Sequence, residues 1–200
     1  MIFTTGVMGG GNDQLAYAYG ITRDSTSNIL YVSDKDNNRV MGYLPGNNSG
    51  FLVAGGNAAG LNDTQLNNPM GIYFDSLSTS LFIVNTLSHN IVRWVIGDNH
   101  WTLVAGSNNG TNGSTSTLFY SPTDVTLDPM GNLYVADRLN HRIQFFLSGQ
   151  SNGSTIAGIS SQSGNDSDKL YCPVAVALDN QLDLYVADNF NHRIQKFVRY

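Results

Sequence analysis

The hydrophobic residues of this chain lie in short runs that are separated by stretches rich in Gly, Asn, Ser and Asp. Residues 124–127, 133–136, 142–146 and 155–158 are four consecutive runs, and β-branched and aromatic residues are common in them. Runs of this length and composition between turn residues predict β-strands. No sustained apolar stripe with a 3.6-residue period occurs, so we expect little helix.

One motif occurs four times along the chain. An apolar strand ends in Asp or Asn, a short spacer follows, and a second apolar strand then begins at Arg or Asn. The four copies are residues 31–40, 82–91, 134–143 and 185–194. Their marker residues Asp34, Asn85, Asp137 and Asp188 lie at intervals of 51, 52 and 51 residues. A fixed period of this length predicts a repeat architecture.

The strands are apolar along nearly their whole length, as in 133–136 and 142–146, so both faces of each sheet require cover. Four short strands per unit, covered on both faces by the neighbouring units, are typical of a β-propeller blade. A β-solenoid is the alternative, but its coils are usually shorter than these units. We therefore predict an all-β fold, a β-propeller of about four four-stranded blades.

The predicted blades form one domain over 1–200. They span approximately residues 15–56, 66–107, 118–158 and 170–200. The last blade lacks a fourth strand of its own, and segment 2–8 resembles the outer-strand segments 52–56 and 103–106. Segment 2–8 could complete the last blade and thereby close the ring. Two interpretations stay open at this point: a closed four-bladed ring, or part of a larger ring.

The repeat resembles the NHL repeat. The resemblance lies in Tyr-Val-Ala-Asp, a short spacer, Asn-His-Arg-Ile-Gln and an Ala-Gly turn, and it is strongest in the two C-terminal copies. It covers essentially the whole chain, although the copy at 82–91 is degenerate. NHL domains are typically six-bladed propellers, so the resemblance favours part of a six-bladed ring, whereas the matching ends favour closure.

Oppositely charged residues recur at a spacing of five. The predicted structural ion pairs are Asp34 with Arg39, Asp137 with Arg142 and Asp188 with Arg193. In the second copy both members are Asn, at 85 and 90, so both charges are lost together. Loss of only one would leave a buried charge unpaired, which is costly. We interpret these pairs as links that hold each hairpin.

Histidine recurs at one repeat position, in His89, His141 and His192. Zinc requires ligands about 2 Å from one point. Equivalent positions on adjacent blades are roughly 10 Å apart, so we expect a structural role rather than a metal site. The single Cys172 is expected to be a small buried residue, not a nucleophile. We expect no catalytic residues, no cofactor and no metal ion.

Composition narrows the range of partners and locations. The net charge is −5 with only 10 Lys and Arg residues, which disfavours nucleic-acid binding. No apolar run has the length of a membrane span, and Met1–Gly11 does not resemble a signal peptide. Possible N-glycosylation sites occur at Asn47, Asn62, Asn109, Asn112, Asn152 and Asn165. These favour an extracellular protein, or the ectodomain of a larger one.

Long polar loops, at 57–68, 107–121 and 159–171, are expected to lie beside the hairpins on one face of the propeller. Variable loops on a rigid scaffold suit binding, so we predict a non-catalytic module for a protein, peptide or glycan. One alternative is an enzyme resembling peptidyl-hydroxyglycine amidating lyase, whose metal-binding histidines have no counterpart here. Another is the substrate-recognition region of a tripartite-motif ubiquitin ligase, which the acidic balance and the sequons disfavour.

Overall fold

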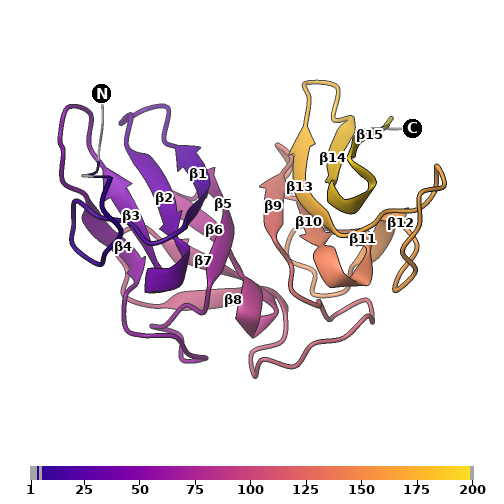
Figure 1. The fold of residues 1–200 in the computed structure, drawn as a ribbon, viewed down its shortest axis with the longest axis horizontal. Helices are drawn as coiled ribbons and strands as arrows, with labels where there is room; N and C mark the ends of the chain where they lie inside the picture. Colours follow the sequence, from indigo (N-terminus) through magenta and orange to yellow (C-terminus); the bar gives the residue numbers. More distant parts are fainter. Residues whose placement is uncertain (1–3, 5, 199–200) are drawn as a thin grey trace.

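The computed structural model describes residues 4 and 6–198. Four antiparallel sheets stand around a common axis as the blades of a four-bladed β-propeller (Figure 1). The only helices among the described residues are four single turns of 3-10 helix. The predicted all-β propeller of four blades is therefore confirmed.

In the first three blades four strands follow one another in both sequence and space. The first blade contains β1 (Ala18–Arg23), β2 (Leu30–Asp34), β3 (Arg39–Tyr43) and β4 (Phe51–Gly55). The second contains β5 (Pro69–Asp75), β6 (Ser80–Asn85), β7 (Asn90–Val95) and β8 (Trp101–Gly106). The third contains β9 (Asp124–Leu127), β10 (Leu133–Asp137), β11 (Arg142–Phe146) and β12 (Ser154–Gly158).

The last blade has three strands among the described residues: β13 (Pro173–Leu178), β14 (Leu184–Asp188) and β15 (Arg193–Phe197). Residues 2, 3 and 5 of the predicted closing strand 2–8 lie outside the described residues. Met8, at the end of that segment, forms a bridge with Leu15 in the first blade. Closure of the last blade by segment 2–8 therefore stays a prediction.

The hairpin between the second and third strands is the same in every blade. The strands pair up to the Asp or Asn at their end, as in Asp137 opposite Arg142. A single 3-10 turn then joins them: η1 (Lys35–Asn37), η2 (Thr86–Ser88), η3 (Arg138–Asn140) and η4 (Asn189–Asn191). The residue after each turn adopts the left-handed conformation and is Asn38, His89, His141 or His192. Asn and His tolerate that conformation better than most residues do.

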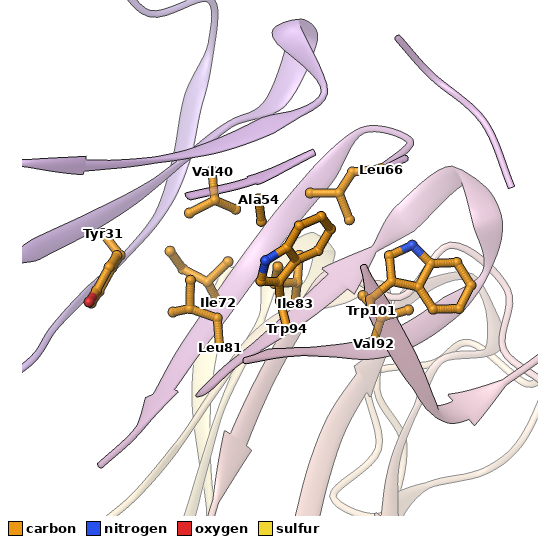
Figure 2. Packing of buried hydrophobic residues seen from close by; sticks show 10 residues of the cluster. All are labelled: Tyr31, Val40, Ala54, Leu66, Ile72, Leu81, Ile83, Val92, Trp94 and Trp101. Carbon is orange, nitrogen blue, oxygen red and sulfur yellow. The ribbon is translucent and has the colours of Figure 1, made fainter. Parts of the chain in front are cut away.

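Most of the hydrophobic core lies between blades. Each junction joins residues of the second, third and fourth strands of one blade to the inner strand and the following strands of the next. Figure 2 shows the first junction, where Val40 and Ala54 of the first blade meet Ile72, Ile83 and Trp94 of the second. Burial of one such aliphatic side chain stabilises the fold by about 1.5–3 kcal/mol. The strands of the second and third blades are thus covered on both faces, as their sequence predicts.

Three of the four possible junctions are packed in this way. Inner strand β1 packs on β5, β5 on β9, and β9 on β13, with no comparable packing of β13 on β1 among the described residues. The first and last blades stand on opposite sides of the molecule in Figure 1. Ile21 of β1 is 63% exposed and Ile194 of β15 is 66% exposed. The ring is therefore open between its last and first blades.

Candidate functional site

Each charged hairpin contains a buried ion pair. Arg Nε donates to the Asp Oδ2 at 2.6 Å in Asp34–Arg39 and at 2.8 Å in Asp137–Arg142 and Asp188–Arg193. An Asn of the 3-10 turn, such as Asn140, donates to the same oxygen at 2.8 Å. We call this Asp, Asn and Arg arrangement the clasp. All six residues that the sequence predicts as ion pairs thus lie in three equivalent contacts.

The clasp also holds the long loop that precedes each inner strand. In the third blade the Arg142 guanidinium donates to the carbonyls of Ser114, Thr115 and Leu118, at 2.8–2.9 Å. Asp137 Oδ1 accepts the backbone N–H of Tyr120 at 2.8 Å. The first and last blades repeat this pattern with Arg39 and Arg193. The sequence suggested a link within the hairpin, whereas the side chains mainly fasten a loop about 25 residues earlier.

The second blade has no charged clasp, and Asn85, Ser88 and Asn90 stand at its positions. Trp101 replaces one hydrogen bond of the missing arginine, because its indole Nε1 donates to the carbonyl of Gln65 at 2.8 Å. In the last blade the equivalent carbonyl, that of Lys169, accepts from the Arg193 guanidinium instead. The indole thus satisfies an acceptor that elsewhere requires arginine, and it fills part of the space with apolar surface.

The repeated histidines link neighbouring blades. His89 Nδ1 accepts the backbone N–H of Ser121 at 3.1 Å, and His141 Nδ1 accepts that of Cys172 at 3.2 Å. Burial lowers the pKa of both imidazoles, which favours the neutral form that can accept a hydrogen bond. Within the described part of the chain no three metal-ligating side chains are grouped. Cys172 is buried, as predicted, and burial raises the pKa of its thiol.

One buried carboxylate, that of Asp124, lies against the inner strands of both neighbouring blades. Asp124 begins inner strand β9, and its equivalents in the other blades are Gly20, Gly71 and Ala175. Its Oδ2 accepts the N–H of Val176 at 2.9 Å, and a Cβ on Gly71 would lie only 2.4 Å from its Oδ1. Burial raises the pKa of the Asp124 carboxyl to about 6.

Asp124 lies outside the motif that the repeats share, so the sequence does not predict it as a site residue. The sequence did contain a signal for this residue: Asp124 is charged, whereas the equivalent position is Gly or Ala in the other blades. Tyr19 lies close enough for the Asp124 carboxylate to act on it, and burial and this charge raise the pKa of its phenol. The positive charge of the Arg138 guanidinium lowers the pKa of the same phenol and so opposes these two effects. The charges of Asp124 and Arg138 thus act on the same phenol with opposite effect.

The face that carries the hairpins also presents apolar side chains. The long loops meet the hairpins there, as the N–H of Leu139 donates to the Tyr120 carbonyl at 3.0 Å. We call the exposed residues Leu87, Tyr120, Tyr171 and Phe190 the apolar strip. The strip is fixed by edge-to-face ring contacts of Tyr120 with His89, and of Tyr171 with His141 and Phe190. Arg138 lies on η3, on the same face, and forms no ion pair with any described residue.

The opposite face has a cleft between the second and third blades. Phe82, Arg93, Leu103, Leu147 and Gln150 are among the residues that line it, and its volume is about 460 Å³. Arg93 is held there by a 3.0 Å hydrogen bond to Ser80 Oγ. No carboxylate, histidine or cysteine is among the residues that line the cleft.

The fold and repeats define the class of protein. Four antiparallel blades around an axis make the chain a β-propeller. The model of the NHL repeat matches residues 119–146 and 170–197, which lie in the third and last blades. The chain is therefore a β-propeller with NHL repeats, as the hairpin motif suggested.

Known proteins agree with this class. Protein SUPPRESSOR OF QUENCHING 1, chloroplastic, of Arabidopsis thaliana is 26% identical over 206 residues, which cover 88% of this chain and 19% of that protein. A gluconolactonase of Xanthomonas campestris matches with a TM-score of 0.71 at 18% identity, over 94% of this chain and 60% of its own. Streptogramin B lyase matches with a TM-score of 0.65 at 13% identity, over 100% and 55%. At these identities the two structures show the fold alone.

This chain spans about a fifth of the curated relative and little more than half of these two solved structures. No helix in the described part of the chain has the length and hydrophobicity required to cross a membrane.

The clasp predicts a large stability loss when its arginine is removed. In Arg142→Met the Asp137 carboxylate stays buried without its cation, and three loop carbonyls lose their donor. We expect the free energy of unfolding to fall by about 3–5 kcal/mol in urea denaturation. The control Arg23→Met, at an exposed position, should change it by about 0.5 kcal/mol or less. Unaltered stability of Arg142→Met would rule out a structural clasp.

Asp124 predicts a pH-dependent difference in stability. Its pKa is raised from 3.8 to about 6 in the folded protein, so the buried charge destabilises the fold above pH 6. This cost disappears as the pH falls through 6 toward 4, where the folded carboxyl is protonated. Asp124→Asn should therefore be more stable than wild type by about 1–3 kcal/mol near pH 7.5, and nearly equal to it near pH 4.

Urea denaturation at both pH values measures this difference. Subtracting the wild-type curve removes the contributions of His89 and His141, which titrate in both proteins. Asp98→Asn, which removes an exposed carboxylate, serves as the control substitution and is measured at the same two pH values. A variant that is less stable than wild type near neutral pH would show that the charged form of Asp124 is required by the fold.

Proposed function

We propose that this propeller is a non-catalytic binding module that recognises a protein, peptide or glycan on its hairpin face. The observation that carries the proposal is the apolar strip together with Arg138. Tyrosine and arginine are the residue types that dominate interface energetics, because each combines apolar area with a polar group. An arginine that forms no ion pair with the described residues is free to pair with a carboxylate or with the hydroxyls of a ligand.

The rigidity of this face supports the same proposal. The clasps hold the long loops at several carbonyls each, so the loops are ordered before a partner arrives. A preformed surface loses less conformational entropy on binding than a flexible one does. The loop sequences differ between blades, and the surface is therefore not repeated four times.

A second candidate function is an enzyme that acts at the axis, and Asp124 is the observation that favours it. A carboxyl group with a pKa of about 6 is suited to act as a general base near neutral pH. Asp124 already accepts the N–H of Val176 through one of its oxygens, and the close backbone of Gly71 crowds the other. We favour the binding module because this crowding leaves little room for a substrate.

Binding is tested by screening the purified chain on a glycan array and against a displayed peptide library. Each ligand found is then measured by calorimetry with Tyr120→Ser, Tyr171→Ser and Arg138→Ala. We expect these variants to weaken binding by about 10-fold or more, since each removes a central contact. Leu77→Ser and Met130→Ser alter exposed residues in the strand-connecting turns and should bind normally. Ligands that bind all five variants equally would place the site elsewhere.

We also propose that the protein is extracellular or an ectodomain. All six sequon asparagines, at 47, 62, 109, 112, 152 and 165, are exposed, so the folded protein would tolerate glycans at each. We expect secreted expression in a eukaryotic cell to yield protein that loses mass on treatment with an N-glycosidase. Replacement of all six by Gln is the control and should abolish the shift. Secreted wild-type protein without glycan would remove the support that the sequons give.

A further inference from the structure

The cleft between the second and third blades contains a cation that has no anionic partner. Arg93 lies in β7, is half-buried and donates through Nε to Ser80 Oγ at 3.0 Å. The Ser80 hydroxyl is neutral and itself donates to the Ser78 carbonyl at 2.9 Å. Arg93 forms no ion pair with any described residue. Its two terminal nitrogens are therefore available to an anion that enters the cleft.

The last blade shows how the repeat neutralises a cation at this position. Lys196 in β15 is the repeat equivalent of Arg93, because each is the fourth residue of its strand. Lys196 Nζ pairs with Asp183 Oδ2 at 2.8 Å and with Asp179 Oδ2 at 3.6 Å. Ser80 is the equivalent of Asp183, because each lies five residues before the end of its blade's second strand. The second blade thus has the cation without the carboxylate.

The cleft beside Arg93 has the size and lining of a small-molecule site. Its volume is about 460 Å³, and sites for small ligands typically measure about 300–1,000 Å³. Apolar side chains of Phe82, Leu103 and Leu147 line it, and the two leucines are 41% and 58% exposed. The hydroxyl of Ser148 adds a polar group to this lining. Such a cleft suits a ligand that has an apolar part and one charged end.

Both walls of the cleft come from one packed junction. Strand β8 of the second blade supplies residues 102–104, and the turn after β11 of the third blade supplies residues 147–151. The turn is closed by a 2.9 Å hydrogen bond from the Gln150 N–H to the Leu147 carbonyl. The two blades share a hydrophobic cluster that includes Val84 and Val135. The cleft is therefore formed entirely by a junction inside the chain.

We propose that this cleft binds a small organic acid, with its carboxylate on Arg93 and its apolar part against Leu103 and Leu147. The terminal nitrogens of a guanidinium provide the two parallel donors that a carboxylate accepts. The ligand thereby supplies the negative charge that Asp183 supplies to Lys196 in the last blade. The site lies on the face opposite the apolar strip, so it is separate from the binding surface proposed for the hairpin face.

The charge of the cleft favours a monocarboxylate over a phosphate. Arg93 is the only cation among the described residues that line the cleft, whereas a phosphate group carries a charge of about −1.5 to −2 near neutral pH. The protein has a net charge of −5, which also disfavours a polyanion. Since Phe82 and the two leucines offer apolar surface, the occupant is a monocarboxylate with an aliphatic or aromatic portion.

Ligand titration followed by NMR of the full isotope-labelled chain tests the proposal directly. The probes are phenylacetate and hexanoate, their neutral amides, and inorganic phosphate. We expect the two carboxylates to shift the amide signals of cleft residues such as Leu103 and Ser148, with dissociation constants of about 1 mM or below. The neutral amides and phosphate should bind at least about 10-fold more weakly.

Two results of this titration would overturn the proposal. In the first, the amides or phosphate bind as tightly as the carboxylates, so that the carboxylate group is not what the cleft recognises. In the second, the carboxylates leave the signals of the cleft unchanged up to about 20 mM, a concentration that would saturate a site of the expected affinity.

An internal carboxylate provides a second test. Ser80→Asp places a carboxylate where the last blade has Asp183, so that Arg93 pairs within its own chain. Ser80→Asn adds a similar volume without charge, and the third blade has Asn132 at this position. Both variants are first checked for wild-type dispersion of their NMR signals. We expect Ser80→Asp to bind the carboxylates at least about 10-fold more weakly than Ser80→Asn, whereas equal affinities would contradict the proposed role of Arg93.

Removal of the cation gives an independent result. Arg93→Gln retains a donor for Ser80 without a charge and should lower the carboxylate affinity by at least about 10-fold. Arg23→Gln removes an exposed arginine outside the cleft and should bind like wild type. Equal losses in the two variants would show that only net charge matters and would overturn the proposal. Because the titration monitors signals of the cleft, either outcome leaves the proposal for the hairpin face unaffected.

Discussion

The fastening of a long loop by a hairpin arginine, in three of the four blades, is the interaction on which the rest of the structure depends. Arg142 bridges a buried carboxylate, Asp137, and three carbonyls of the preceding loop. A loop without secondary structure has backbone groups that need partners, and the guanidinium has enough donors to satisfy several of them. The inner strand that follows the loop is thereby placed at the axis, and the apolar strip is placed on the surface.

The second blade shows that a neutral donor can satisfy one of the loop carbonyls that an arginine satisfies in the other blades. Asn85 and Asn90 replace the ion pair, and the indole of Trp101 takes over the Gln65 carbonyl. Two neutral side chains avoid the desolvation cost of a buried ion pair. The indole of Trp101 also packs in the hydrophobic cluster of the first junction (Figure 2). This exchange explains how one blade can depart from the repeat while its geometry is kept.

Residues that the repeats share and residues that interrupt the repeat lie in different places. His89 and His141, at a position that is histidine in three of the four copies, hydrogen-bond to the next blade, whereas Asp124 and Arg138 occupy positions where one blade differs from the others. Function in such a scaffold should therefore be sought at positions where one blade differs from the others. The recurring histidines follow the same division, because His89 and His141 use Nδ1 to bind the next blade.

The sequence by itself determined the repeat, the strands and the pairing of Asp137 with Arg142, because strand alternation and turn residues act over a few neighbours in the chain. It also indicated the NHL class through the hairpin motif. Only the tertiary structure decided that the arginines fasten distant loops, that Trp101 substitutes for one of them and that Asp124 is buried. It likewise decided that Ile21 and Ile194 stay exposed, although their repeat equivalents are buried. These outcomes depend on which residues of one blade contact the next. The contacting residues are about 50 positions apart in the chain, so a local sequence pattern does not predict the contacts.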